Sequence, residues 1–271
     1  MHAMHPQAGQ KGTAPNRKWL AVWIGIIGFL TITARADDGA FTNLLAQSTR
    51  SAQHADWPGA FQCLTEARRL ADTNGVALCQ LTKAYCDLMH QTSSSELQKK
   101  LAVQALATAQ LAVQAAPTNA TAHLCVAVCY VKNFPYAASA QKVIWSRAIK
   151  TECETAIALD PRQDVGYYLL GRWEVGVANM NFLVKGLVKL VYGGLPAASN
   201  AEAIRNFKKA IALAPQRIIH HAELAKVYAA TGERQLALAE WHICDSLTPV
   251  DADDTDAQTE ARQQLAAGGH H

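Results

Sequence analysis

Two prolines 34 residues apart constrain the fold of the C-terminal part of this 271-residue chain more than any other feature. Pro215 and Pro249 each close a segment with helical periodicity, and the segment between them breaks once, at Thr231-Gly232-Glu233. Large and small apolar residues recur at helical spacing on both sides of the break: Leu224, Ala225 and Tyr228, then Ala237, Trp241 and Cys244. The pattern predicts two antiparallel helices that approach closely at their small residues, with a proline ending the second helix.

The same order of residues recurs upstream. The second-helix pattern is repeated at Ala203, Phe207, Ala210 and Pro215, and its end at Ala156 and Pro161. The first-helix pattern is repeated at Tyr167, Leu170 and Gly171, at His123, Val126, Ala127 and Tyr130, and less regularly at Ala60, Leu64 and Ala67. A 34-residue helix–turn–helix unit of this kind resembles the tetratricopeptide repeat (TPR). We therefore expect an all-α fold, a TPR-like helical-hairpin solenoid with inserted helices.

Gly171 lies inside a segment with a helical pattern, where a glycine costs about 1 kcal/mol relative to alanine. We expect a neighbouring helix to cross closest at this position, because packing that a side chain would block can offset that cost.

Two units are longer than 34 residues. Pro117 to Pro161 spans 44 residues and Pro161 to Pro215 spans 54, so the units carry insertions. The second insertion includes Phe182 to Tyr192, which is apolar nearly all round and carries Lys185 and Lys189. A helix of this kind is normally buried, which is our expectation. The alternatives are a lid over the groove and an interfacial helix whose lysines meet lipid phosphates.

The first 36 residues differ from the rest. A basic segment precedes the apolar run Trp19 to Ala34, and Ala34-Arg35-Ala36 suits a signal-peptidase site. We predict an export signal peptide over 1–36, a TPR-like helical domain over 37–268 and a tail over 269–271. The mature protein would then be exported, to the periplasm of a bacterium. The alternative is an N-terminal membrane anchor, although sixteen apolar residues fall below the roughly 20 that span a bilayer.

Most of the positive charge belongs to this leader. It carries four of the 25 Lys and Arg residues and none of the 22 acids, which leaves the rest of the chain at a net charge of −1. A chain with a net charge this close to zero lacks the excess of positive charge that is typical of nucleic-acid-binding proteins, so no nucleic-acid partner is expected.

The cysteines and histidines are not spaced as in known catalytic or metal-binding motifs. The seven cysteines, Cys63, Cys79, Cys86, Cys125, Cys129, Cys153 and Cys244, include no CxxC and are expected to be mostly buried core residues, with one disulfide as the alternative. The cluster of His220, His221, His242 and Cys244 does not define a tetrahedral site. GxSxG, phosphate-loop and HExxH motifs do not occur. We expect no enzyme, no catalytic residue, no metal and no cofactor, and rank an enzyme using His220, His221 and Cys244 last.

The first helices of a TPR array line its concave face. Residues one place from the packing positions would form a ligand-binding groove: Leu124, Val128, Val131, Tyr168, Arg172, Val175, Ile219 and Lys226. An apolar trough with two cations suits a ligand with an apolar body and a single anionic head. The alternative for Arg172 is an intramolecular or surface salt bridge.

Three segments of the chain resemble the regulator of microtubule dynamics family: LLGRWEVGVAN (169–179), YGGLPAASNAEAIRNFKKAIALAP (192–215) and HHAELAKVYAATG (220–232). The resemblance implies an all-helical, non-catalytic TPR-like protein, here a bacterial-type exported member. Animal members lie at mitochondria, the endoplasmic reticulum and microtubules, and one tethers membranes and binds and transfers phospholipid through its TPR domain. We expect an exported protein-interaction scaffold of unknown protein partner. Binding or transfer of phospholipid or another amphiphile is the alternative, and microtubules are not an expected partner of an exported chain.

Overall fold

The computed structural model describes residues 36–268, which form twelve α-helices, one 3-10 turn and their connections, without a strand in that range. The helices are α1 (Ala36–Gln53), α2 (Trp57–Ala71), α3 (Gly75–Gln91), α4 (Ser95–Ala115), α5 (Ala120–Asn133), α6 (Ser139–Leu159), α7 (Asp164–Ala178), α8 (Phe182–Tyr192), α9 (Asn200–Leu213), α10 (Ile218–Ala230), α11 (Arg234–Ser246) and α12 (Ala252–Gly268). The predicted signal peptide lies outside the described residues, apart from Ala36.

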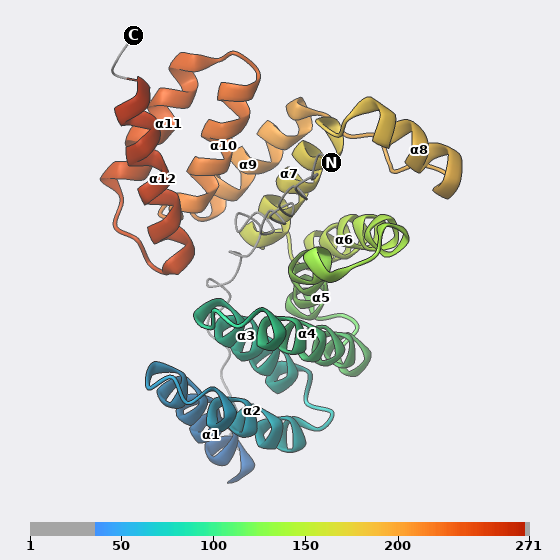
Figure 1. Cartoon of the computed structure of the whole chain (residues 1–271), viewed down its shortest axis with the longest axis vertical. Coiled ribbons are helices and arrows are strands. Elements are labelled where there is room, and N and C mark those ends of the chain that lie inside the picture. The colour runs from blue at the N-terminus through green and yellow to red at the C-terminus, as the bar shows by residue number, and fades with distance from the viewer. Residues whose placement is uncertain (1–35, 269–271) are drawn as a thin grey trace, which may run out of the picture.

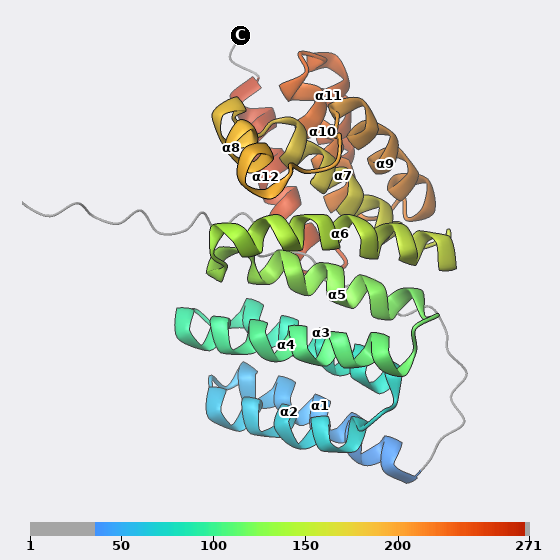
Figure 2. The same ribbon diagram turned by 90° about the vertical axis from the view of Figure 1, so that its right-hand side faces the viewer.

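Ten of these helices pair into five antiparallel hairpins, α1–α2, α3–α4, α5–α6, α7–α9 and α10–α11. The hairpins stack in chain order, which Figure 2 shows as successive layers from α1–α2 upward. Helix α12 packs on α10 and α11 and ends the stack (Figure 1). The expected all-α, TPR-like solenoid is confirmed. One detail was wrong: Ala60, Leu64 and Ala67 lie on α2, the second helix of its hairpin and not a first helix.

The close helix crossing expected at Gly171 is present. A Cβ atom placed on Gly171 would lie 2.6 Å from Cε1 of Phe207, whose ring on α9 is fully buried. The same place in the neighbouring first helices is occupied by Ala127 and Ala225, both fully buried. Small residues at this place therefore let the two helices of each hairpin pack closely.

Several helices begin at a side chain that accepts a hydrogen bond from a free backbone N–H group. Asn119 accepts from Thr121 N at 2.9 Å at the start of α5, and Ser199 accepts from Glu202 N at 3.1 Å at the start of α9. Between α10 and α11, Gly232 has a φ of 84°, a left-handed conformation that glycine adopts without strain. Local sequence thus sets the start of these helices and the turn between α10 and α11.

The seven cysteines are all buried and free. The expectation that they are small core residues is confirmed, and the disulfide alternative is wrong for this structure. They contribute apolar packing between helices.

The two insertions take different forms. The first is accommodated by the 3-10 turn η2 (Phe134–Tyr136) and the long helix α6. The second forms α8 and its connection to α9. Helix α8 has no buried residue and packs mainly on α6 among the helices, so the expectation that it is buried was wrong. The chain bends by 101° between α7 and α8, and Figure 1 shows α8 projecting from the side of the array.

Candidate functional site

Three cations occupy one register position in the first helices of the hairpins. Arg172 and Lys226 each lie eleven residues after the proline that closes the preceding hairpin, and Lys83 lies eleven residues after Asp72, which takes that proline's place. The corresponding residue of α5 is Val128. Helices α3, α5, α7 and α10 are neighbours in that order along the array. We call Lys83, Arg172 and Lys226 the cation ladder.

Arg172 contacts Tyr168 and Glu223 within the protein. Its NH1 donates to the Tyr168 hydroxyl at 3.0 Å, one turn earlier on α7, and its Nε lies 3.7 Å from Oε2 of Glu223 on α10. Tyr168 is itself buried, and burial raises the pKa of its phenol, so the hydroxyl is neutral when it accepts from Arg172. The contact with Glu223 connects two successive hairpins through opposite charges.

Lys226 connects α10 to α12. Its Nζ lies 3.0 Å from Oε1 of Glu223 and 2.7 Å from Oε2 of Glu260. Burial alone would raise the pKa of Glu223, but the charges of Arg172 and Lys226 outweigh it and hold that pKa below its ordinary value. Burial acts against the charged form of Lys226 as well, and the two carboxylates reverse the effect and raise its pKa. Both groups are therefore charged at neutral pH.

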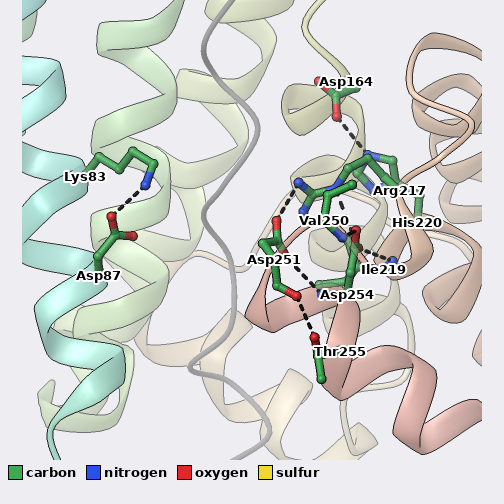
Figure 3. Close-up of polar contacts among 10 residues, drawn as sticks. All are labelled: Lys83, Asp87, Asp164, Arg217, Ile219, His220, Val250, Asp251, Asp254 and Thr255. Atoms are coloured by element: carbon green, nitrogen blue, oxygen red, sulfur yellow. Dashed lines mark hydrogen bonds and ion pairs between the residues drawn. The ribbon is translucent and has the colours of Figure 1, made fainter. Parts of the chain in front are cut away.

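Lys83 pairs within its own helix. Its Nζ lies 2.6 Å from Oδ2 of Asp87, one turn later on α3 (Figure 3, left). Burial raises the pKa of Asp87, the charges of Lys83 and Lys132 oppose the rise, and the charge of Asp253 adds to it. Asp253 belongs to the first turn of α12.

A second charged cluster fastens α12 to the start of α10 (Figure 3). Arg217 NH1 lies 2.6 Å from Oδ2 of Asp251 and Arg217 Nε lies 3.6 Å from Oδ1 of Asp254. Asp254 also accepts from the backbone N of Ile219 at 3.1 Å and from that of Val250 at 3.4 Å. Burial raises the pKa of Asp254 in spite of Arg217. We call Arg217, Asp251 and Asp254 the α12 clamp.

The predicted groove residues divide into a buried and a partly exposed set. Leu124, Val128, Tyr168 and Ile219 are buried, whereas Val131, Arg172, Val175 and Lys226 are partly exposed. The first four side chains are therefore covered by the protein itself, and ligand binding by the groove residues stays a prediction. Leu124 faces Gly166 of the next hairpin, and the Tyr168 ring lies 6.2 Å from the ring of Phe207 and 5.1 Å from that of His220. Stacking of successive hairpins covers these positions.

The alternative for Arg172, an intramolecular salt bridge, is confirmed. The sequence did not point to its partner Glu223, nor to Lys83, Asp87, Asp253 and Glu260. The signal that could have found Lys83 is its register, which was hidden because Asp72 replaces the closing proline.

Two histidines hold the hairpins closed in the same way. Nδ1 of His221 lies 2.7 Å from Oε2 of Glu240 on α11, and Nε2 lies 3.2 Å from the carbonyl O of Pro215. His123 repeats this with Glu152 at 2.6 Å and the carbonyl of Pro117 at 2.8 Å. Each ring thus joins the second helix of its hairpin to the turn before the first.

The neighbouring His220 has another role. Its Nε2 lies 2.9 Å from Oδ2 of Asp164 at the start of α7, and burial lowers its pKa in spite of that carboxylate. The ring is therefore neutral at pH 7 and donates from Nε2. Over residues 36–268, no group of three or more His, Cys, Asp or Glu side chains is arranged to hold a metal ion.

Comparison with known proteins agrees with this repeat architecture. The sequence pattern of the family described as regulator of microtubule dynamics protein 1-3 matches residues 42–268. The chain belongs to this family. It is 27% identical over 211 residues to regulator of microtubule dynamics protein 2 of Mus musculus, covering 77% of this chain and 51% of the relative. It is 28% identical over 225 residues to protein 1 of the same species, covering 82% and 73%. The chain thus spans about half the length of the protein 2 relatives.

Among solved structures, a thermophilic TPR protein of Thermus thermophilus is similar to this family member with a TM-score of 0.57 and 17% identity. The match covers 83% of this chain and 99% of that one. At this identity the likeness concerns the fold alone, which is a TPR-like helical repeat.

Proposed function

We propose that this chain is an exported, non-catalytic scaffold that binds a protein partner along the inner face of its first helices. The observation that carries the proposal is the cation ladder, which repeats one charge at one register position over α3, α7 and α10. Stacked repeats offer extended surfaces for partners, and cations that recur at one register position suit a partner segment that carries carboxylates. Lys226, whose side chain is 36% exposed, is the most accessible of the three.

Photo-crosslinking in the host tests this scaffold role. Gln80, exposed on α3 one turn before Lys83, would be replaced by a photoreactive residue, and Gln110, exposed on the second helix α4, by the same residue as the control. We expect one discrete crosslinked protein from position 80, lost when Lys83→Glu is added, and none from position 110. Equal crosslinking at both positions, or none at position 80, would contradict the proposal.

The export part rests on the composition of residues 1–36 and has its own test. Cell fractionation followed by N-terminal sequencing should find the protein outside the cytoplasm with Asp37 as its first residue. A chain that keeps Met1 and sediments with membranes would support the anchor instead. A soluble cytoplasmic chain would contradict both.

Binding of an amphiphile in the same groove is the second candidate. It is favoured by the partly exposed apolar residues Val131 on α5 and Val175 on α7, of which Val175 lies one turn after the partly exposed Arg172. Native mass spectrometry of protein purified from its host should then show a bound mass that extracts as phospholipid, and Arg172→Glu should remove it.

The names of the relatives refer to microtubule dynamics, and we do not extend that activity to an exported chain. Co-sedimentation with polymerised tubulin is expected to leave this protein in the supernatant.

A further inference from the structure

Helix α8 exposes far more apolar surface than any other part of residues 36–268. Phe182 is 76% exposed, Leu183 66%, Leu187 59% and Leu190 84%, and Val184 and Val191 are also exposed. Isolated exposed apolar residues are ordinary on a soluble protein, but a contiguous apolar patch marks a site of interaction. No residue of α8 is buried, and among the helices α8 packs mainly on α6.

Most of the apolar residues of α8 lie on one side of the helix, whereas Phe182 lies beside the lysines. At about 100° per residue, Leu183, Val184, Leu187, Leu190 and Val191 fall on one face, and Lys185, Lys189 and Tyr192 fall on the opposite one. The helix is thus amphipathic, and its apolar face is turned to solvent.

The position of this helix on the array is fixed at both ends. Asn181 accepts from Leu183 N at 2.9 Å and caps the start of α8. At its end Gly193 adopts a left-handed φ of 76°, and Arg147 of α6 donates to the carbonyl groups of Tyr192 and Gly194. The helix is therefore a formed and anchored element, and Figure 1 shows it standing out from the stacked hairpins.

Charge indicates what this face meets. Between residues 181 and 198 the charged side chains are Lys185 and Lys189, with no acid in that range. A helix of 11 residues is about 16 Å long, too short to cross a hydrocarbon core of about 30 Å. No single helix in residues 36–268 is long and apolar enough to span a membrane; α7 and α8 reach that length and apolarity together, but they are bent and α7 is packed in the core. An element of this size, amphipathic and purely cationic, suits the plane of an anionic membrane surface.

We propose that α8 docks this protein onto a bilayer containing anionic lipid, with Leu183, Leu187 and Leu190 among the acyl chains near the head groups and Lys185 and Lys189 at the lipid phosphates. The repeat body stays outside the bilayer, attached through Arg147. This role is independent of the partner face on the first helices, because α8 lies on the insertion and carries none of the ladder residues.

A local fluorescent probe tests the docking. All seven native cysteines are buried, so a thiol-reactive, polarity-sensitive dye can be attached selectively to Leu190→Cys, with Val103→Cys, 52% exposed on α4, as the matched control. Vesicles would contain phosphatidylcholine with about 30% phosphatidylglycerol, an anionic fraction at which basic residues are attracted to the surface. We expect a blue shift and quenching by a bilayer-embedded quencher at position 190 and neither at position 103. The readout is local, so binding through another segment of the chain does not produce it.

Charge variants separate the two parts of the proposal. Each lysine near an anionic surface contributes about fivefold to binding, so Lys185→Gln together with Lys189→Gln should weaken it about 30-fold. Leu187→Asp should abolish it, while the helical circular dichroism signal remains. A blue shift without vesicles that grows with protein concentration would show self-association and overturn the proposal, as would an unshifted probe on anionic vesicles. An equal shift on pure phosphatidylcholine would overturn the role of the lysines.

Discussion

Gly171 of α7 faces the ring of Phe207 of α9 so closely that a Cβ atom would lie 2.6 Å from the ring edge. The ring is fully buried and belongs to the continuous core of the stacked hairpins, so it has little room to move away. The packing of this hairpin therefore depends on the absence of one methyl group.

Gly171→Ala should lower the free energy of unfolding by about 1 to 2 kcal/mol, because overpacking outweighs the gain in helix propensity. Gly176 lies on the same helix and serves as the control, because a Cβ atom added there would have no neighbouring atom within 4 Å. Gly176→Ala should raise stability by about 0.5 to 1 kcal/mol. Urea unfolding followed by circular dichroism measures both. Stabilisation by Ala at both positions would refute the close crossing.

Glu223→Gln should lower the free energy of unfolding by about 3 kcal/mol, because Arg172 and Lys226 lose the carboxylate they share in a poorly solvated place. The matched control is Glu66→Gln, which removes an exposed ion pair in which Arg69 NH1 lies 3.0 Å from Oε2 of Glu66. Exposed pairs contribute roughly 0 to 1 kcal/mol, so this variant should be nearly neutral. Chemical denaturation measures the free energy of unfolding of both variants. Equal losses in the two would mean that the Glu223 contacts contribute little to stability.

Acidification from pH 7 to 5.5 should destabilise the protein through His220. Burial lowers its pKa in the folded state, so the unfolded chain binds the proton first, near pH 6.5, and stability falls as pH falls. The loss is at most about 1.4 kcal/mol per pH unit for one histidine. Subtracting the pH profile of His220→Asn from that of the wild type should isolate this slope.

Asp254→Ala should loosen α12. The substitution removes the acceptor for the backbone N of Ile219 and one partner of Arg217, both buried, at a cost of about 1 to 3 kcal/mol. Hydrogen exchange along α12 should accelerate before that of α5 and α7. Asp256→Asn, at an exposed site on the same helix, should not change it. Unaltered exchange in the Asp254 variant would show that the α12 clamp is not what holds the helix.

The hairpins were predictable from the sequence because their packing leaves local marks. A closing proline, a small residue at the crossing and a large one opposite are all needed within 34 residues, so Gly171 could be placed before its partner was seen. The membership of each helix in a hairpin was less secure where the proline is missing, as at Asp72, and α2 was assigned to the wrong place in its hairpin.

The candidate site was harder to predict for two physical reasons. An apolar helix has the same sequence pattern whether protein or another medium covers it, so α8 was expected to be buried. Arg172 and Glu223 are 51 residues apart in the sequence and are brought together by the stacking of successive hairpins. Helical periodicity does not relate residues so far apart in the sequence. The same stacking covers Leu124 and Tyr168, which one hairpin alone would expose.

The charged contacts between hairpins make each unit specific for its neighbour. Glu223 of α10 pairs with Arg172 of α7, and His220 of α10 contacts Asp164 at the start of α7. If one hairpin were deleted, duplicated or moved, a carboxylate such as Glu223 would face a hairpin without its cation. An array of identical repeats does not have this problem, because every interface is the same. The modules of this array are therefore not interchangeable, and new length is tolerated where it already occurs, in the segments that join the helices of one hairpin.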